Sequence, residues 1–251
     1  MGHSQGKPLS QLDGDLGVPE VHVWYGSPVD VTRDMQRQLL GILNDDERRR
    51  AARFKVDAAR TQFVVSRGWL RLVLGRYLRA DARQIELRFS RHGKPELTNS
   101  HGLHFNLSHT LGLTAIAVTR LGLIGIDVEK ISRERDVLNL AKRFFSGKEA
   151  DWVASKTGAE QTRAFLTCWT AKEAFIKAHG EGLSIPLDSF AIMPAGGGIL
   201  KFELFKDPSE SRRWSVSLLD VPSGFQGAVA VEASGFEVRV GELPSSLEKV
   251  V

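Results

Sequence analysis

The 251-residue sequence predicts an α+β fold in two halves, residues 1–120 and 121–251. Each half contains one long helical pattern, at 44–79 in the first and at 160–179 in the second. Each half also contains several short strand-like segments, which favour a small and mostly antiparallel sheet. No sequence repeat relates the halves, but their element content is similar. A hydrophobic fraction of 42% and a charged fraction of 25% are typical of a globular protein.

The elements of the first half follow from local patterns. Residues 21–25 alternate in the manner of a strand, and the basic stretch 44–79 is helical, with Asn44 as a plausible N-cap. A break into two helices is expected at Asp57 or at Gly68. Three further strands are expected, with the turn RHGKP after the first of them: 85–89, 103–107 and 113–119.

In the second half, IGIDVEK at 124–130 is expected to form a strand, because its apolar run is typical of a buried one. Ser146 and Glu149 are spaced as a capping box, so a helix is expected to begin there. The long helix over 160–179 is expected to end at Gly180. Four strand-like segments follow, the second after a glycine-rich hairpin turn: 188–193, 198–205, 214–220 and 226–233.

Composition limits the function only broadly. The net charge of +4 indicates attraction to phosphates, other polyanions or an acidic partner, although a solvated basic surface explains it equally well. Cys168 is the only cysteine, which excludes an internal disulfide and a cysteine-rich zinc site and makes a reduced, cytoplasmic setting the default. No apolar run approaches the roughly 20 residues that a membrane helix needs. Residues 1–18 are polar and have no signal-peptide core, so we expect a frayed leader.

Asp127 and Glu129 end the apolar strand and share one of its faces, because side chains alternate along a strand. Neighbouring carboxylates repel each other, and a divalent cation relieves that repulsion. Oxygen-only ligands suit Mg²⁺, which keeps waters and bridges to substrate phosphates. The alternative is that one carboxylate pairs with Lys130 or a nearby arginine where the strand reaches water. The local pattern alone favours that alternative.

Glu173 and Lys177 are four residues apart on the long helix and therefore share a face. In this position Glu173 is available as a third oxygen ligand or as a base, and Lys177 as a phosphate contact. An ordinary surface ion pair explains the same spacing. A capping box from Thr170 to Glu173 is disfavoured, because the apolar periodicity already starts at Phe165. Cys168, on the same helix, is expected to pack rather than to react.

Ser108 and His109 lie in NLSHT, where a strand runs into a turn. Neighbours on an extended chain point in opposite directions, which argues against a Ser–His nucleophile pair and against a metal shared by His104 and His109. At a strand end, Ser108 and His109 are instead placed to hydrogen-bond a phosphate. Lys94 in the GKP turn and the arginine run around Arg50 are further phosphate-binding candidates, although such runs are usually solvated faces.

Taken together and in this order, the segments resemble the 4′-phosphopantetheinyl transferases, in the larger, pseudo-dimeric class that primes carrier domains of nonribosomal peptide and polyketide synthases. The resemblance covers roughly residues 45–233, with a similar basic stretch at ERRRAARF (47–54). Each motif is weak alone, but five in this order are specific. The motifs are GKPEL (93–97), FNLSHT (105–110), IGIDVEK (124–130), RFFSGKE (143–149) and WTAKEAFIKAHGEGLS (169–184).

The resemblance implies two similar α+β halves with the active site between them. It also implies the reaction: the 4′-phosphopantetheine arm of coenzyme A passes to a serine of an apo acyl, peptidyl or aryl carrier protein, and adenosine 3′,5′-bisphosphate leaves. Mg²⁺ is the implied cofactor. The implied protein is a monomer with no nucleic-acid partner and no membrane partner.

The resemblance also assigns roles to the candidate residues. By position, Asp127, Glu129 and Glu173 resemble the magnesium-binding acids, and Glu173 is the expected base, acting directly or through a water. Lys177 resembles the lysine near the pyrophosphate and the leaving group, so Asp127, Glu173 and Lys177 are the expected catalytic residues. The residues that resemble contacts to the coenzyme A phosphates are Arg50, Lys94, Ser108 and His109, together with Lys177.

Two other classes of function are consistent with parts of the sequence. A nucleic-acid-binding module that uses the basic helix predicts salt-sensitive retention of DNA or RNA, but it leaves the three acidic residues unexplained. A metal-dependent phosphohydrolase predicts turnover of coenzyme A with no carrier protein present.

Overall fold

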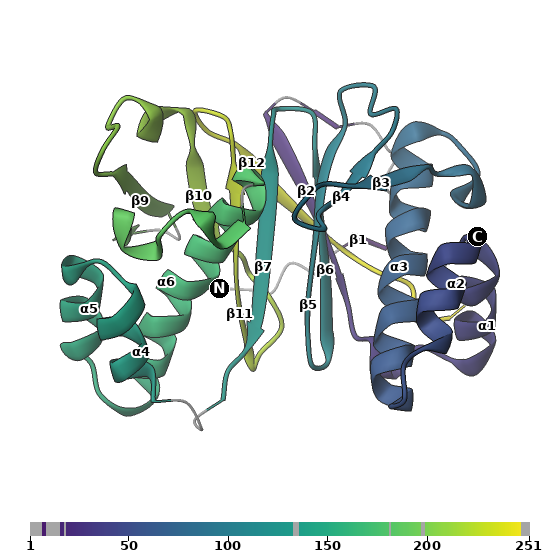
Figure 1. The fold of residues 1–251 in the computed structure, drawn as a ribbon, viewed down its shortest axis with the longest axis horizontal. Helices are drawn as coiled ribbons and strands as arrows, with labels where there is room; N and C mark the ends of the chain where they lie inside the picture. The colour runs from purple at the N-terminus through teal and green to yellow at the C-terminus, as the bar shows by residue number, and fades with distance from the viewer. Residues whose placement is uncertain are drawn as a thin grey trace.

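The computed structural model describes residues 7–8, 16–17, 19–132, 136–180, 182–196 and 199–246. Two five-stranded sheets occupy the centre of the molecule, and helices cover its two sides (Figure 1). Helices from the first part of the chain pack beside one sheet, and helices from the second part pack beside the other. The predicted α+β class with two similar halves is confirmed.

The first sheet has the strand order β1 (Lys7–Pro8), β12 (Glu237–Glu242), β2 (Glu20–Gly26), β6 (Leu113–Thr119) and β5 (His104–Thr110). Its helices are α1 (Arg33–Ile42), α2 (Asp45–Ala52) and α3 (Asp57–Leu78). The core between them includes the buried rings of Trp24 on β2 and Trp69 on α3. A two-stranded hairpin, β3 (Leu87–Phe89) and β4 (Pro95–Leu97), carries the GKP turn.

The boundary between α2 and α3 decides between the two predicted break points. The prediction at Asp57 is confirmed, because α3 begins there, whereas Gly68 lies inside α3. A Cβ at Gly68 would lie 2.7 Å from the Leu39 side chain, so this glycine allows α1 to approach α3. The predicted cap of α2 is also confirmed, since Asn44 and Glu47 form a reciprocal capping box. The sequence did not predict α1, which buries only two side chains, Met35 and Leu39.

The second sheet has the strand order β7 (Ile124–Lys130), β11 (Phe225–Val231), β10 (Ser215–Leu218), β9 (Ile199–Leu204) and β8 (Phe190–Gly196). All five strands were predicted, with ends that differ by a few residues. Its helices are α4 (Val137–Phe144), which the sequence did not predict, α5 (Gly147–Ala154) and α6 (Gly158–His179). The capping box of Ser146 and Glu149 at α5 and the end of α6 at Gly180, with φ of 84°, are confirmed.

Strand β6 and the first five residues of β7 are buried on both faces, although every strand that pairs with them is antiparallel. One face of each strand lies toward a helix, and the other face joins a core shared between the two sheets. Val23 of β2, Ala117 of β6 and Ile126 of β7 are members of that shared core. Burial on both faces explains why IGIDVEK begins as a continuous apolar run rather than an alternating one.

The last strand departs from the predicted division of the chain at residue 120. β12 lies in the predicted second half, yet it pairs in parallel with β2 of the first sheet, with Val238 opposite Val21. On its other side β12 pairs with Lys7 and Pro8, so these two residues of the predicted leader belong to the sheet. The remainder of 1–18 lies outside the described residues, apart from Leu16 and Gly17.

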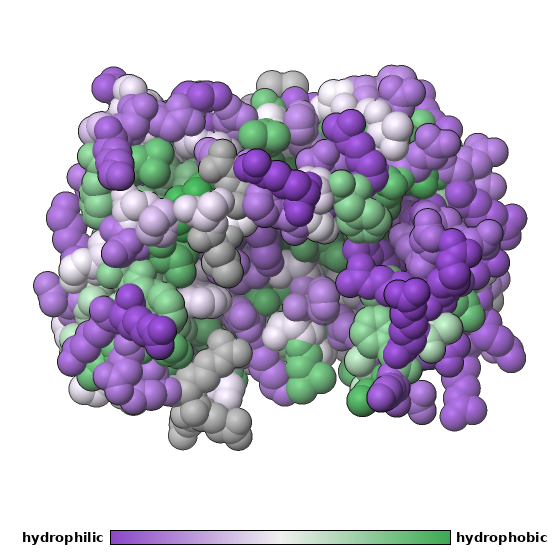
Figure 2. Space-filling view, viewed as in Figure 1, coloured by the Kyte–Doolittle hydropathy of each residue, from purple (hydrophilic) through white to green (hydrophobic). Residues whose placement is uncertain are grey.

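The remaining elements are short 3₁₀ turns: η2 (Pro28–Asp30), η3 (Ala82–Gln84), η4 (Gly182–Ser184), η5 (Leu187–Ser189) and η6 (Glu210–Arg213). Hydrophilic side chains dominate the surface over α1 and α2, on the right of Figure 2. Among the described residues, no helix combines the length and the apolar character that a bilayer span requires.

Candidate functional site

The site forms where α6 crosses β7, and Gly125 makes that crossing close. A Cβ on Gly125 would lie 2.0 Å from the carbonyl oxygen of Ala174 and 2.4 Å from the backbone nitrogen of Ala178. Only glycine leaves room for the helix backbone here. Because side chains alternate along a strand, Asp127 and Glu129 lie on the same face of β7 as Gly125, toward α6.

Asp127 is the centre of the site and is 5% exposed. Its Oδ1 accepts hydrogen bonds from Lys177 Nζ at 2.6 Å and from Ser108 Oγ at 3.0 Å. Lys177 Nζ also donates to Ser108 Oγ at 3.1 Å, which closes a three-membered cluster from β7, α6 and β5. Asp127 Oδ2 is buried and has no hydrogen-bond partner within the described part of the chain. Burying a carboxylate oxygen without a partner lowers the stability of the fold unless a ligand or an ion binds to it.

Glu173 lies one turn before Lys177 on α6 and is half-buried. Burial raises the pKa of Glu173, the charges of Asp127 and Glu129 raise it further, and Lys177 opposes them. The charges of Asp127 and Glu129 therefore both reach Glu173. In the described ranges, no three His, Cys, Asp or Glu side chains are already gathered closely enough to hold a metal ion. The hard oxygen donors and the unpartnered Oδ2 nevertheless fit a hard divalent cation.

Strand β5 meets β7 through side chains rather than through a backbone ladder. Asn106 Oδ1 accepts from the backbone N–H of Ile126 at 2.9 Å, and Ser108 Oγ accepts from that of Val128 at 3.3 Å. Thr110 Oγ1 accepts from the N–H of Lys130 at 3.4 Å. This seam joins the edges of the two sheets and fixes Ser108 beside Asp127. Asn106 was not predicted as a site residue, although the period-two series Asn–Ser–Thr in NLSHT was the available signal.

The predicted phosphate-binding residues lie partly apart from the acidic cluster. His109 is exposed, on the opposite face of β5 from the buried Ser108, as predicted. Desolvation lowers the pKa of His109, and the positive charges of Lys177 and Arg67 lower it further. Arg50 is exposed on α2, with its guanidinium 5.2 Å from the centre of the Phe63 ring. Arg67 was not predicted, because a single arginine in a basic helix carries no distinguishing pattern.

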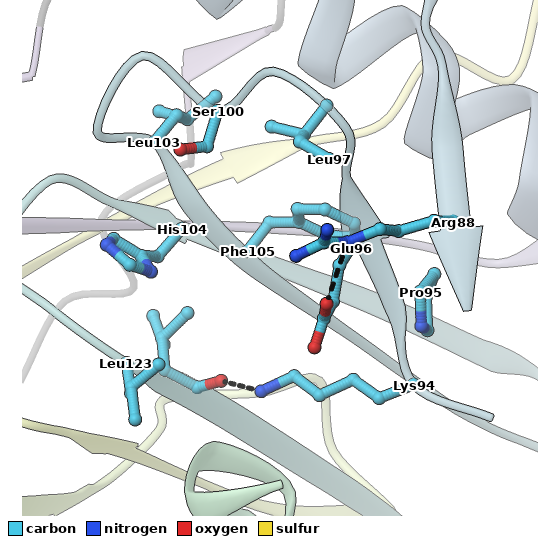
Figure 3. Close-up of a pocket in the computed structure, with 11 residues that line it drawn as sticks. Arg88, Lys94, Pro95, Glu96, Leu97, Ser100, Leu103, His104, Phe105 and Leu123 are labelled. Carbon is cyan, nitrogen blue, oxygen red and sulfur yellow. Dashed lines mark hydrogen bonds and ion pairs between the residues drawn. The ribbon is translucent and has the colours of Figure 1, made fainter. Parts of the chain in front are cut away.

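Lys94 does not point freely into a cleft. Its Nζ donates to three backbone carbonyls, those of Lys177 at 2.6 Å, Ile124 at 3.1 Å and Ala178 at 3.3 Å. Figure 3 shows its side chain extended beneath the Arg88–Glu96 ion pair. Burial lowers the pKa of Lys94 to about 8. Its predicted contact with a coenzyme A phosphate stays a prediction, and that contact would require the ammonium to leave these carbonyls.

Two cavities of about 260 Å³ each flank Lys94. One is lined by Glu173 and Lys177 together with the hairpin residues His92 to Pro95, so it opens onto the site. The other, shown in Figure 3, lies between the β3–β4 hairpin and the first residues of β5 and β7, with His104 and Phe105 on its wall. It contains none of the three acidic residues.

A buried ion pair that the sequence analysis missed anchors α6. Lys172 Nζ lies 2.9 Å from Glu149 Oε2 and donates to the carbonyls of Leu187 and Phe190, both at 2.7 Å. Both charged side chains are fully buried. The available signal was that Lys172 falls on the apolar face of α6, four residues before Ile176, where a charge is costly unless it is paired.

Family models and sequence relatives indicate one family. Residues 123–230 match the 4′-phosphopantetheinyl transferase superfamily, and residues 30–120 match the family described as 4′-phosphopantetheinyl transferase, N-terminal. The chain is 38% identical over 168 residues to the 4′-phosphopantetheinyl transferase HetI of Nostoc sp., covering 66% of this chain and 70% of that protein. It is 32% identical over 216 residues to the 4′-phosphopantetheinyl transferase Sfp of Bacillus subtilis, covering 84% and 93%. A holo-[acyl-carrier-protein] synthase structure from Thermotoga maritima matches with a TM-score of 0.37 and 23% identity, over 45% of this chain and 63% of that one.

Proposed function

The chain belongs to the 4′-phosphopantetheinyl transferases, and from that premise we propose that it transfers the 4′-phosphopantetheine arm of coenzyme A to a serine of an apo acyl or peptidyl carrier protein in a magnesium-dependent reaction. The second product is adenosine 3′,5′-bisphosphate. The observation that carries the proposal is the cluster of Asp127, Ser108 and Lys177 beside Glu173, with a buried carboxylate oxygen of Asp127 unpartnered among the described residues.

Asp127, Glu129 and Glu173 are the residues that would hold Mg²⁺. Bound there, the ion would neutralise the pyrophosphate of coenzyme A and stabilise charge at the attacked phosphorus. Burial raises the pKa of Glu173, and the charges of Asp127 and Glu129 raise it further; this proximity of the three carboxylates supports the assignment.

Two protein side chains act on the proton of the carrier serine and on the leaving group. Glu173 accepts the proton of the carrier serine, directly or through a water. The serine oxygen forms a bond to the phosphorus that bears the pantetheine arm, and the bond to the adenosine bisphosphate oxygen breaks. Lys177 Nζ, held by Asp127 and Ser108, stabilises the negative charge on the departing bisphosphate.

The partners follow from the same proposal. A basic protein with a net charge of +4 suits an acidic carrier protein, and we propose a monomer that acts in the cytoplasm without a nucleic-acid partner. Coenzyme A is the proposed donor, and Arg50, Lys94, Ser108 and His109 are the proposed contacts to its phosphates.

The test is a mass-spectrometric labelling assay with apo carrier protein, coenzyme A and Mg²⁺. The wild type is expected to add the phosphopantetheine mass to the carrier. Asp127→Ala is expected to lose this labelling by at least about 100-fold, because it removes a ligand of the proposed ion and an anchor of Lys177. Asp34→Asn, an exposed carboxylate on α1 paired only with Arg37, is the control and should label normally.

Unchanged labelling by Asp127→Ala, with the variant folded, would overturn the site assignment. Hydrolysis of coenzyme A in the absence of carrier would support the phosphohydrolase instead. Labelling that persists in excess EDTA would remove the metal from the proposal.

A further inference from the structure

The cavity in Figure 3 combines apolar walls with basic side chains. Its volume is about 260 Å³, and it lies between the β3–β4 hairpin and the first residues of β5 and β7. An apolar group that displaces water from apolar walls is favoured, and small-molecule sites are commonly built in this way. The apolar side chains on the wall are the buried Leu97, Leu103, Phe105 and Ile124 and the more exposed Leu123.

His104 lines this cavity at the point where the seam between β5 and β7 ends. Asn106, Ser108 and Thr110 each accept a hydrogen bond from the backbone N–H of the residue twenty positions later, on β7. His104 lies on the same face of β5, because side chains alternate along a strand. Neither of its ring nitrogens has a hydrogen-bond partner among the described residues. The seam therefore does not continue to His104, and its half-buried imidazole is available to a ligand.

Positive charge exceeds negative charge on the described wall of the cavity. Arg88 and Lys94 are cations, and Glu96, the one carboxylate, accepts from Arg88 Nε at 3.2 Å. Burial lowers the pKa of Lys94 to about 8, and the charge of Glu96 opposes this shift only in part. Desolvation lowers the pKa of His104, the charge of Lys94 lowers it further, and Glu232 opposes them. A negative charge in the cavity would relieve the cost of burying the Lys94 ammonium.

We propose that this cavity binds a small monocarboxylate with an apolar body, either a short fatty acid or an aromatic acid. The body would lie against Leu103, Phe105 and Leu123, and the carboxylate would accept from His104 near the positive charge of Lys94. The volume limits the ligand to on the order of ten non-hydrogen atoms, because drug-sized ligands need about 300–1,000 Å³. The inference goes beyond the proposed function and does not depend on it, since none of the three acidic residues lines this cavity.

NMR of leucine methyl groups in the purified full-length protein measures the binding, with benzoate and hexanoate as probes and no coenzyme A present. At least one of the two acids should saturate, with a Kd on the order of 1 mM or below, as is usual for ligands of this size. The methyl signals of Leu97, Leu103 and Leu123 should shift, and those of Leu39 on α1 and Leu166 on α6 should not. Benzamide, the uncharged analogue of benzoate, should bind about ten-fold more weakly, because it lacks the negative charge.

Two positions on the wall test the origin of that preference. Lys94→Met should lower the affinity for benzoate to within about two-fold of the affinity for benzamide. Lys94→Gln, which retains a donor for the backbone carbonyls, repeats the comparison in case methionine alters the cavity. His104→Leu removes the proposed donor and should weaken benzoate binding by about five-fold or more. Lys148→Met is the matched control, because it removes the same charge from a side chain that is 65% exposed, and it should keep the ten-fold preference.

Three results would overturn the proposal. The first is the absence of a saturable shift of the three cavity leucines with either acid. The second is an equal affinity of the wild type for benzoate and benzamide, because the charge of the ligand would then play no part. The third is a preference for benzoate that survives in both Lys94 variants. If those variants also lose benzamide, the His104→Leu comparison decides, and benzoate binding within about two-fold of the wild type in that variant overturns the proposal.

Discussion

Two lysines enter the protein interior, and their ammonium groups are stabilised differently. Lys172 meets the Glu149 carboxylate as well as two carbonyls. Lys94 meets three carbonyls and, among the residues that the structure describes, no carboxylate within hydrogen-bond distance. Carbonyl dipoles stabilise a cation less than a full negative charge does, and burial consequently lowers the pKa of Lys94 to about 8, with Glu96 opposing the shift. Lys94 therefore joins the β3–β4 hairpin to the end of α6. Its contribution to the free energy of unfolding depends on whether the amine is protonated.

Lys94→Met should change how stability depends on pH. The pKa of Lys94 is about 8 in the folded protein and 10.5 in its ordinary state, so between these values the unfolded chain binds more protons. The free energy of unfolding of the wild type should therefore gain on the order of 3 kcal/mol, relative to Lys94→Met, from pH 7 to pH 10.5. Urea unfolding at both pH values measures this. Lys148→Met, whose side chain is 65% exposed, is the control and should follow the wild type. The prediction would be wrong if the free energy of unfolding changed by the same amount between the two pH values in the wild type and in Lys94→Met.

At the scale of elements, the site depends on how closely a helix lies on a strand. Gly125 lets the backbone of α6 approach β7 directly, and this brings Lys177 within 2.6 Å of Asp127. The Lys172–Glu149 pair then fixes the same helix from its opposite, buried side. The geometry of the acidic cluster is thus set by the packing of the backbone of α6 against β7.

Gly125→Ala should separate α6 from β7. The added methyl group would meet the backbone of Ala174 and Ala178, which cannot move without shifting the helix, so the free energy of unfolding should fall by about 2 kcal/mol or more. Carrier labelling should fall with it. Gly41→Ala is the matched control, because nothing lies within 4 Å of its Cβ and alanine favours the helix α1. It should raise stability by about 0.5 kcal/mol in the same urea titration. Equal stability of the two variants would contradict the close packing.

The sequence predicted the elements whose patterns are local and missed those defined by distant partners. The cap at Asn44, the capping box at Ser146 and the end of α6 at Gly180 depend on a few neighbouring residues, and all three were predicted correctly. Strand β12 was missed, because its place is set by pairing with β2 more than 200 residues earlier. In the site, the shared face of Asp127 and Glu129 followed from strand periodicity. Burial of Arg67 did not, since it depends on the tertiary position of Phe89.

At the scale of the whole molecule, the two halves are not independent units. Their sheets share one apolar core, and the Asn106–Ser108–Thr110 seam joins β5 to β7. The chain also returns from the second sheet to the first, where β12 lies between β1 and β2. A Cβ on Gly241 of β12 would lie 2.4 Å from the Trp24 ring, so this return packs tightly against the first core.

A chain that ends at Phe236 should therefore damage the first half. Removing β12 would leave the edge of β2 unpaired and would uncover Trp24, and the Pro244 carbonyl that accepts from Trp69 Nε1 would also be lost. We expect a non-cooperative or strongly lowered thermal transition and a smaller soluble yield. A chain that ends at Ser246 keeps these contacts and is the control. A truncated protein that ends at Phe236 and melts like this control would show that the return strand is dispensable.

Strand β12 also has a consequence for synthesis. Domains usually fold from the N-terminus as the ribosome releases them. Here the nascent first sheet has no neighbour on one side of β2 until residues 237–242 have been translated, after the whole second sheet. Until then the apolar edge of β2 is unpaired in the first half, and such exposed edges are the kind of surface that chaperones bind. Translation order and the order of strands in the sheet therefore oppose each other, because the first sheet is completed only when residues 237–242 pair with β2.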